Sequence, residues 1–227
     1  MKKIAIFVEG MTEQELTIRL LLAIAGNKGI TLEIQEQHKG TLNLVEIRQQ
    51  NPAQFYILLV NCNTDNQVKS QIAYQHAKLT QSGYTKIIGL RDVFPHPIAD
   101  LPKVQQFLSA GLPTGGTPID IVLAVMEVEA WFIEETTHFD RVHKDMTHSN
   151  ILAKGYDLQS TRGHDWPNPA ATLDAIYSQW GMRYTKCRKR VERTLDALSL
   201  EEFYVNTRAK SPSLDQYLTS IETGLAL

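Results

Sequence analysis

The chain has 227 residues, two cysteines and a formal net charge of −2. This length can bury a sizeable core, either as one large domain or as one domain with an appendage. The small net charge argues against a surface coated in basic side chains for nucleic acid, although a local basic groove is compatible with it. The cysteines are too few for a disulfide framework, and no apolar run is long enough for a membrane helix. We therefore expect a soluble cytoplasmic protein that makes no membrane contact.

The first predicted elements are a strand over residues 4–8 and the helix that follows it. The strand segment is apolar throughout, which is typical of a parallel strand covered on both faces. Gly10 permits a tight turn, and Thr12 with Glu15 fits a capping box, so we expect the helix to begin near residue 12. Glu9 then stands at the rim where open α/β sheets bind ligands. The simpler alternative is that Glu9 is only a polar residue in a turn.

Strand and helix patterns alternate along the chain up to about residue 135. Apolar runs predict strands, helical spacing predicts helices, and residues such as Pro52 and Gly83 mark the breaks between them. The predicted strands are residues 31–37, 55–60, 86–90 and 119–126, and the predicted helices are residues 42–50 and 66–81. This alternation predicts an α/β domain over residues 1–135, with a mostly parallel sheet flanked by helices.

The rest of the chain, residues 136–227, differs in character. Its first part, up to residue 170, is rich in His, Asp, Asn and Gly, which favours loops. Helical patterns follow over residues 170–180, 185–198 and 213–223. We interpret this region as a C-terminal helical extension that packs on the α/β domain.

Acidic side chains gather where the predicted strands end. In chain order these residues are Glu9, Asp65, Asp92, Glu127 and Glu129. The carboxyl ends of parallel strands meet at one edge of a sheet, and carboxylates that converge there suit Mg²⁺, which prefers oxygen ligands. The alternative for Asp65 and Asp92 is that each caps the helix that follows it, which is a common role for aspartate.

Several segments together resemble a known family. An apolar strand, then Glu9-Gly10, then Thr12-Glu13 at a helix start resembles the first motif of the Toprim domain, which topoisomerases, primases and overcoming-lysogenization-defect nucleases share. Later segments are similar to a Toprim-like bacterial family of uncharacterised function, whose wider group often accompanies an ATPase in anti-phage defence. These segments are Asp92-Val93-Phe94-Pro95, Glu127-Val128-Glu129-Ala130-Trp131-Phe132, Tyr184-Thr185-Lys186 and Ser213-Leu214-Asp215-Gln216-Tyr217-Leu218.

The resemblance implies a Toprim-like fold and a metal-dependent nuclease or phosphotransferase that acts on DNA or RNA. Glu9 would be the catalytic proton-transfer residue, and Asp92, Asp65 and Glu129 would hold Mg²⁺ or Mn²⁺. A separate ATPase would be the partner of such a defence effector. A third class, an enzyme of small phosphate compounds without nucleic-acid contact, is favoured by the net negative charge.

The chain departs from the family pattern at one strand end. Where Toprim domains carry Asp-x-Asp, this sequence reads Asn61-Cys62-Asn63. Asparagine keeps an oxygen ligand but lacks the negative charge that makes a site for a hard cation strong. The alternative to an enzyme is therefore a catalytically degenerate module that acts by binding a partner ATPase or nucleic acid.

Basic residues concentrate between Arg183 and Arg193, where the chain has six Lys or Arg and one Glu. Basic side chains contact phosphates, and an adjacent aromatic can stack on an exposed base. The predicted nucleic-acid or phosphate contacts are Lys186, Arg188, Lys189 and Arg190. The alternative is a solvated helix face with Val191 and Leu195 packed inward.

Overall fold

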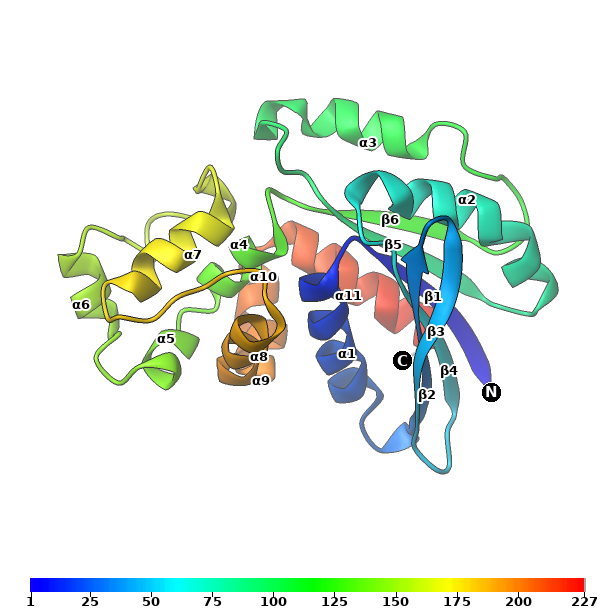
Figure 1. The fold of residues 1–227 in the computed structure, drawn as a ribbon, viewed down its shortest axis with the longest axis horizontal. Coiled ribbons are helices and arrows are strands. Elements are labelled where there is room, and N and C mark those ends of the chain that lie inside the picture. The colour runs from blue at the N-terminus through cyan, green and yellow to red at the C-terminus, as the bar shows by residue number, and fades with distance from the viewer. Residues whose placement is uncertain (227) are drawn as a thin grey trace. The chain divides into compact units, whose positions relative to one another are not determined.

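The computed structural model describes residues 1–226, apart from the side chains of residues 65 and 66. Its sheet has six strands in the order β3-β2-β4-β1-β5-β6 (Figure 1). The strands are β1 (Lys2–Val8), β2 (Ile30–His38), β3 (Thr41–Gln49), β4 (Phe55–Asn61), β5 (Lys86–Asp92) and β6 (Ile119–Ala124). β1 pairs in parallel with β4 and β5, β2 pairs in parallel with β4, and β3 runs antiparallel to β2. The predicted α/β class with a mostly parallel sheet and a C-terminal helical region is confirmed.

The chain divides into two compact units. The first contains residues 1–91, 102–123 and the C-terminal segment from Gln216, and the second contains residues 92–101 and 124–215. The predicted boundary between residues 135 and 136 stays a prediction. None of the described helices is both long and apolar enough to cross a membrane.

Helices account for most of the chain outside the sheet. The α-helices of the first unit are α1 (Met11–Ala25), α2 (Asp65–Gln81), α3 (Leu101–Ser109) and most of α11 (Pro212–Leu225). Those of the second unit are α4 (Val128–Glu134), α5 (His138–Val142), α6 (His148–Ala153), α7 (Pro169–Ser178), α8 (Arg188–Ala197), α9 (Leu200–Glu202) and α10 (Arg208–Lys210). Short 3₁₀ turns lie at Gly26–Lys28, Ile98–Asp100 and Gly163–Asp165, and a π turn lies at Phe203–Thr207.

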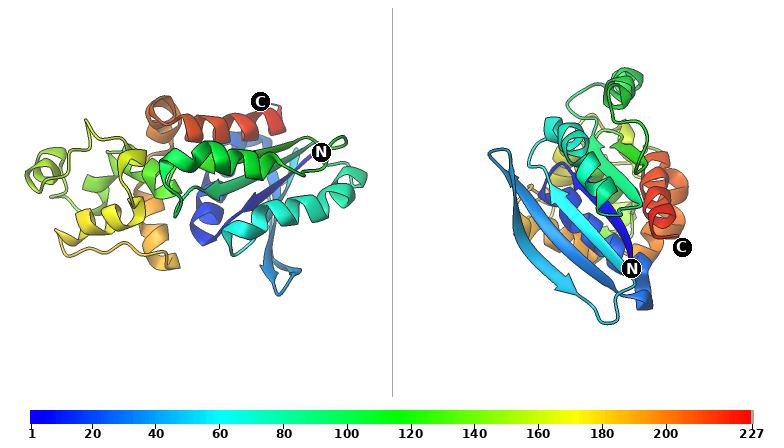
Figure 2. Two further views of the ribbon diagram at one scale, coloured as in Figure 1. Left: turned by 90° about the horizontal axis from the view of Figure 1, so that it is seen from above. Right: turned by 90° about the vertical axis from the view of Figure 1, so that its right-hand side faces the viewer.

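In the first unit, helices cover both faces of the sheet. α2 and α3 lie on one face, and α1 and α11 lie on the other (Figures 1 and 2). Ala5 and Phe7 of β1 belong to the core cluster that includes Val68 and Ile72 of α2. A Cβ atom built on Gly89 of β5 would come within 2.9 Å of the Ile72 side chain, so α2 can lie this close only above a glycine. The two-sided burial explains why β1 is apolar from Ile4 to Val8.

The prediction of a helix over residues 42–50 is wrong, because this segment is the edge strand β3. Lys39 and Gly40 both have positive φ, at 49° and 82°, and they form the two-residue turn between β2 and β3. Positive φ at both turn positions matches the right-handed twist of a hairpin. Leu44, Val45 and Ile47 of β3 are more than half exposed, so the strand lacks the alternation that marks a half-buried strand.

The predicted capping box at the start of α1 is also wrong. The N-cap is Gly10, which makes no side-chain cap hydrogen bond, and the helix begins at Met11. Thr12 and Glu15 are buried inside the first turns instead. One turn further on, the Thr17 hydroxyl and the Tyr217 hydroxyl lie 2.6 Å apart in a buried hydrogen bond that ties α1 to α11.

Candidate metal centre

Three buried carboxylates lie together in the second unit. Asp92 is the last residue of β5, Glu127 is the N-cap of α4, and Glu129 lies in the first turn of that helix. Each side chain offers one oxygen to a group whose members all lie within 4.8 Å of one another. Met126, with a φ of 66°, makes the sharp turn between β6 and α4 that brings both glutamates to Asp92. We call these three residues the acidic triad.

Each carboxylate of the triad accepts a hydrogen bond from the protein on one oxygen. The donors are the Val128 N–H to Asp92 Oδ1 at 3.1 Å, the Ala170 N–H to Glu127 Oε2 at 3.0 Å, and the Tyr184 hydroxyl to Glu129 Oε1 at 2.7 Å. The donors come from α4, from α7 and from the segment that precedes α8. Hydrogen bonds of this kind orient carboxylates around a central charge.

The other oxygen of each carboxylate faces the ammonium of Lys186. Lys186 Nζ lies 3.0 Å from Glu127 Oε1, 3.5 Å from Glu129 Oε2 and 3.6 Å from Asp92 Oδ2. The carboxylate side chains are at most 6% exposed, whereas the Lys186 side chain is 44% exposed. When ionised, these four side chains together carry a formal charge of −2. A buried charge is costly unless an opposite charge accompanies it, so the centre still favours a further positive charge.

A second layer of contacts fixes the segment that carries Tyr184 and Lys186. Asp174 of α7 accepts a hydrogen bond from the Tyr184 N–H at 2.8 Å and two from the Arg183 guanidinium at 2.8 and 2.7 Å. The Arg183 hydrogen bonds hold the pKa of Asp174 below its usual value. The buried Tyr184 ring also meets the Tyr177 ring edge to face, with centroids 6.4 Å apart. The backbone near the triad is therefore held in place independently of the Lys186 ammonium.

The other predicted site residues, the catalytic Glu9 and the metal ligand Asp65, lie in the first unit. Glu9 directly follows β1 and is partly buried, and the neighbouring Val8 pairs with Asn61 of β4 and Leu90 of β5. Asp65 opens α2, but its side chain lies outside the described residues. The catalytic role of Glu9 and the metal-binding role of Asp65 stay predictions.

The two asparagines at the end of β4 have local structural roles. The Asn61 side-chain oxygen accepts a hydrogen bond from the Asn63 N–H at 2.9 Å. Asn63 has a φ of 61°, a left-handed conformation that asparagine adopts more readily than most residues, and its amide donates to the Gln37 carbonyl at 2.7 Å. An aspartate carboxylate at position 63 could not make this donation. The two asparagines therefore suit the conformation of this turn.

The basic segment divides into two parts. Lys186 points at the triad, whereas α8 is amphipathic, with Val191 and Leu195 buried. Arg188 is 59% exposed and pairs with Glu192 at 3.6 Å, and Arg190 donates to the Thr185 hydroxyl at 3.1 Å. The burial of Val191 and Leu195 agrees with the alternative in which α8 is a helix with one solvated face. Phosphate contact by Arg188, Lys189 and Arg190 stays a prediction.

The predicted ligand set omitted Glu127, which the structure brings together with Asp92 and Glu129. A signal for it exists in the sequence, because Glu127 and Glu129 stand two residues apart directly after the last apolar strand. The contact between Lys186 and Glu127, by contrast, joins residues 59 positions apart in the chain, and no local sequence pattern predicts it.

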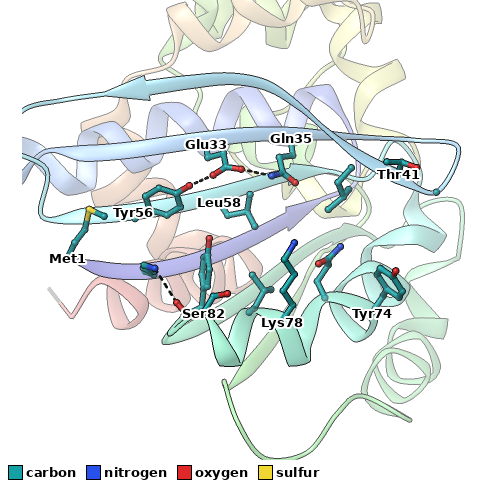
Figure 3. Close-up of a pocket in the computed structure, with 15 residues that line it drawn as sticks. Met1, Glu33, Gln35, Thr41, Tyr56, Leu58, Tyr74, Lys78 and Ser82 are labelled. Carbon is teal, nitrogen blue, oxygen red and sulfur yellow. Dashed lines mark hydrogen bonds between the residues drawn. The ribbon is translucent and has the colours of Figure 1, made fainter.

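A separate hollow of about 770 Å³ lies in the first unit, between α2 and the strands β1, β2 and β4 (Figure 3). Among the described residues that line it, Glu33 is the one carboxylate, and it accepts hydrogen bonds from the Tyr56 hydroxyl and the Gln35 amide. Burial raises the pKa of Tyr84 in this hollow to about 12. A single carboxylate held by neutral donors offers too few oxygen ligands to make this hollow a metal site.

Comparison with protein-family models, with curated proteins and with solved structures found no match. The fold and the centre therefore define a class in structural terms alone. The chain is an α/β protein with a buried acidic triad that could hold a divalent ion.

Proposed function

We propose that this chain is a Mg²⁺- or Mn²⁺-dependent nuclease or phosphotransferase, with the acidic triad as its metal centre. The observation that carries the proposal is the convergence of three buried carboxylates within 4.8 Å of one another. At that separation, two ionised carboxylates repel each other by about 3.5 kcal/mol at an effective dielectric constant of about 20. A divalent cation with oxygen ligands offsets this repulsion more fully than one ammonium does.

The chain's own residues would prepare this centre before any substrate binds. Asp92, Glu127 and Glu129 would hold the ion through the oxygens that face Lys186 Nζ, because their other oxygens already accept hydrogen bonds from the protein. The ion would polarise a phosphoryl oxygen of the substrate. Tyr184 would keep Glu129 in its ligand orientation, as groups around metal ligands commonly do.

The resemblance to the Toprim domain supports the choice of phosphoryl chemistry. It suggests Glu9 as the residue that transfers a proton and DNA or RNA as the substrate. It also suggests a role as an anti-phage defence effector with a separate ATPase partner. A carboxylate in such a role must reach the reacting oxygen through a hydrogen bond.

The test combines metal binding with cleavage. Mn²⁺ affinity, measured by titration calorimetry, is expected to fall at least a hundredfold in Asp92→Asn and Glu129→Gln and to stay unchanged in Asp145→Asn, an exposed acid of the same unit. Cleavage of single- and double-stranded DNA and RNA is expected only with Mn²⁺ or Mg²⁺ and is expected to fall in Glu9→Gln. Wild-type protein that binds no Mn²⁺ at millimolar concentration would refute the proposal.

The second candidate function is a catalytically degenerate module that binds a partner ATPase or nucleic acid. The observation that favours it is the Lys186 ammonium, which lies within 3.6 Å of all three carboxylates and supplies a positive charge without any metal. The exposed Arg188 and Lys189 would then contact nucleic-acid phosphates. This function predicts binding that weakens steeply with salt, whether or not a chelator is present.

A further inference from the structure

We infer that Lys186 is a tethered cation that competes with the divalent ion for the acidic triad, so that metal binding requires its ammonium to withdraw. This inference rests on the proposed function, because it describes how the same centre is regulated. The contacts that carry it are the three distances of 3.0, 3.5 and 3.6 Å from Lys186 Nζ to the carboxylate oxygens.

The ammonium and a metal ion cannot share the triad. A Mg²⁺ or Ca²⁺-sized ion lies about 2.0–2.6 Å from its oxygen ligands, so it must sit between the same three oxygens that now face Nζ. An ammonium has three N–H donors and no acceptor, so it cannot act as a further ligand. Two cations in one buried position would also repel each other strongly. One of them has to leave.

The Lys186 side chain can withdraw from the triad while the residues around it keep their positions. This side chain is 44% exposed, and its contact with Glu127 has hydrogen-bond length, at 3.0 Å, whereas its contacts with Glu129 and Asp92 are longer, at 3.5 and 3.6 Å. Lysine carries its charge on a flexible four-carbon stem, so the head can move without the backbone. The backbone beside it is held by Asp174, which accepts the Tyr184 N–H, and the triad keeps its own backbone and tyrosine donors. Withdrawal breaks the Lys186 contacts with the three carboxylates, including its hydrogen bond to Glu127. The hydrogen bonds that the Val128 and Ala170 N–H groups and the Tyr184 hydroxyl donate to the triad do not depend on Lys186.

The competition has two consequences for the proposed reaction. Lys186 compensates part of the charge of the triad before the metal arrives, and it lowers the apparent metal affinity because it occupies the triad in a fraction of the molecules. If that fraction is about nine in ten, the apparent affinity falls about tenfold. Once the metal is bound, the displaced ammonium is available at the exposed side of the centre for a phosphate of the substrate. Metal would then bind before substrate.

The first test compares Mn²⁺ affinity in four proteins by titration calorimetry. Lys186→Met is expected to bind Mn²⁺ at least about tenfold more tightly than wild type, because no internal cation has to be displaced. Lys186→Arg keeps a cation and is expected to bind no more tightly than wild type. Lys154→Met, which removes one charge from an exposed position of the same unit, is expected to match wild type.

A second measurement uses the wild-type chain, so it does not depend on the folding of a variant. Acetic anhydride modification is followed by peptide mass spectrometry with and without saturating Mn²⁺. Modification of Lys186, relative to Lys154, is expected to rise severalfold when Mn²⁺ releases the ammonium.

The outcomes separate the inference from the proposed function. Equal, measurable Mn²⁺ affinity in wild type and Lys186→Met, or Lys186 reactivity that Mn²⁺ leaves unchanged, would overturn the competition and leave the metal centre standing. Absence of Mn²⁺ binding in wild type and in Lys186→Met alike would overturn both.

Discussion

Two carboxylates in different parts of the molecule are each held by a tyrosine hydroxyl, yet their settings differ. Glu33 in the first unit accepts from Tyr56 and from the Gln35 amide, and it lines an open hollow (Figure 3). Glu129 in the second unit accepts from Tyr184 and is 0% exposed. The first carboxylate accepts hydrogen bonds from neutral donors, whereas the second is buried beside two other carboxylates.

The difference shows what turns a buried acid into a candidate ion site. Neutral hydrogen-bond donors are enough to satisfy one partly buried carboxylate, and a protein has many such donors. Three carboxylates within 4.8 Å repel one another and need positive charge as well. Convergence, more than the volume of a hollow, therefore identifies the centre of the acidic triad as the functional candidate.

The largest expected effect on Mn²⁺ affinity comes from removing one carboxylate charge, at the acidic triad or at the hollow. Glu127→Gln is expected to weaken Mn²⁺ binding at least a hundredfold, because one of three anionic ligands is lost. Glu33→Gln is the matched control and is expected to leave Mn²⁺ affinity unchanged. Titration calorimetry on both variants measures the contrast, and equal losses in the two would show that the triad has no special affinity.

The next effect compares the two tyrosines. Tyr184→Phe removes the donor to a carboxylate that is shut off from water, and it is expected to cost about 2 kcal/mol of unfolding free energy. Tyr56→Phe is expected to cost less than about 1 kcal/mol, because water can replace the donor at the open hollow. Urea unfolding monitored by circular dichroism measures both, and similar costs would argue that the Glu129 site is wetter than its burial implies.

A third prediction concerns a buried ionisable group of the second unit that lies outside the acidic triad. His138 is 0% exposed, and burial lowers its pKa to about 4, aided by the nearby Arg141 cation. The native state therefore keeps His138 neutral, whereas the unfolded chain takes up a proton below its ordinary pKa of 6.5. This contribution to stability is full above that value and is lost as pH falls toward 4.

The expected loss is about 1 kcal/mol between about pH 6.5 and 5.5. Glu135 acts in the opposite sense, because burial raises its pKa and the native state takes up its proton more readily. Unfolding free energies of wild type and His138→Gln at several pH values isolate the histidine, since Glu135 is common to both. Parallel pH profiles would contradict the prediction.

How much of this could be predicted from the sequence depends on what each element buries. β1 was predictable because both its faces are covered, whereas β3 was not, because Leu44, Val45 and Ile47 point to solvent. The turn at Lys39 and Gly40, which joins β3 to β2, indicates a hairpin and argues against a helix over residues 42–50. Local pattern thus specifies covered strands well and exposed edge strands poorly.

The candidate site follows the same division between local and distant information. Asp92 ends β5, and Glu129 lies in the first turn of the helix that follows β6, so the expected position of strand ends in an α/β sheet made both of them candidates. Glu127 lies at an N-cap position, where an acid has an ordinary structural explanation. The position of Lys186 depends on packing between segments far apart in the chain. The basic stretch around Lys186 gives no information about that packing.

The smallest expected effect concerns the exposed cations that do not reach the triad. Arg188 pairs with Glu192 at 3.6 Å on an exposed face of α8, and pairs of this kind contribute about 0.5 kcal/mol or less. Arg188→Gln is therefore expected to leave unfolding free energy almost unchanged. If α8 contacts nucleic acid, the same variant weakens binding and lowers the slope of log affinity against log salt by about one. Fluorescence anisotropy with labelled single-stranded DNA at several salt concentrations measures that slope. A slope unchanged by the substitution would assign Arg188 to the solvated face of α8 and leave Lys186 as the cation of this segment with a role at the acidic triad.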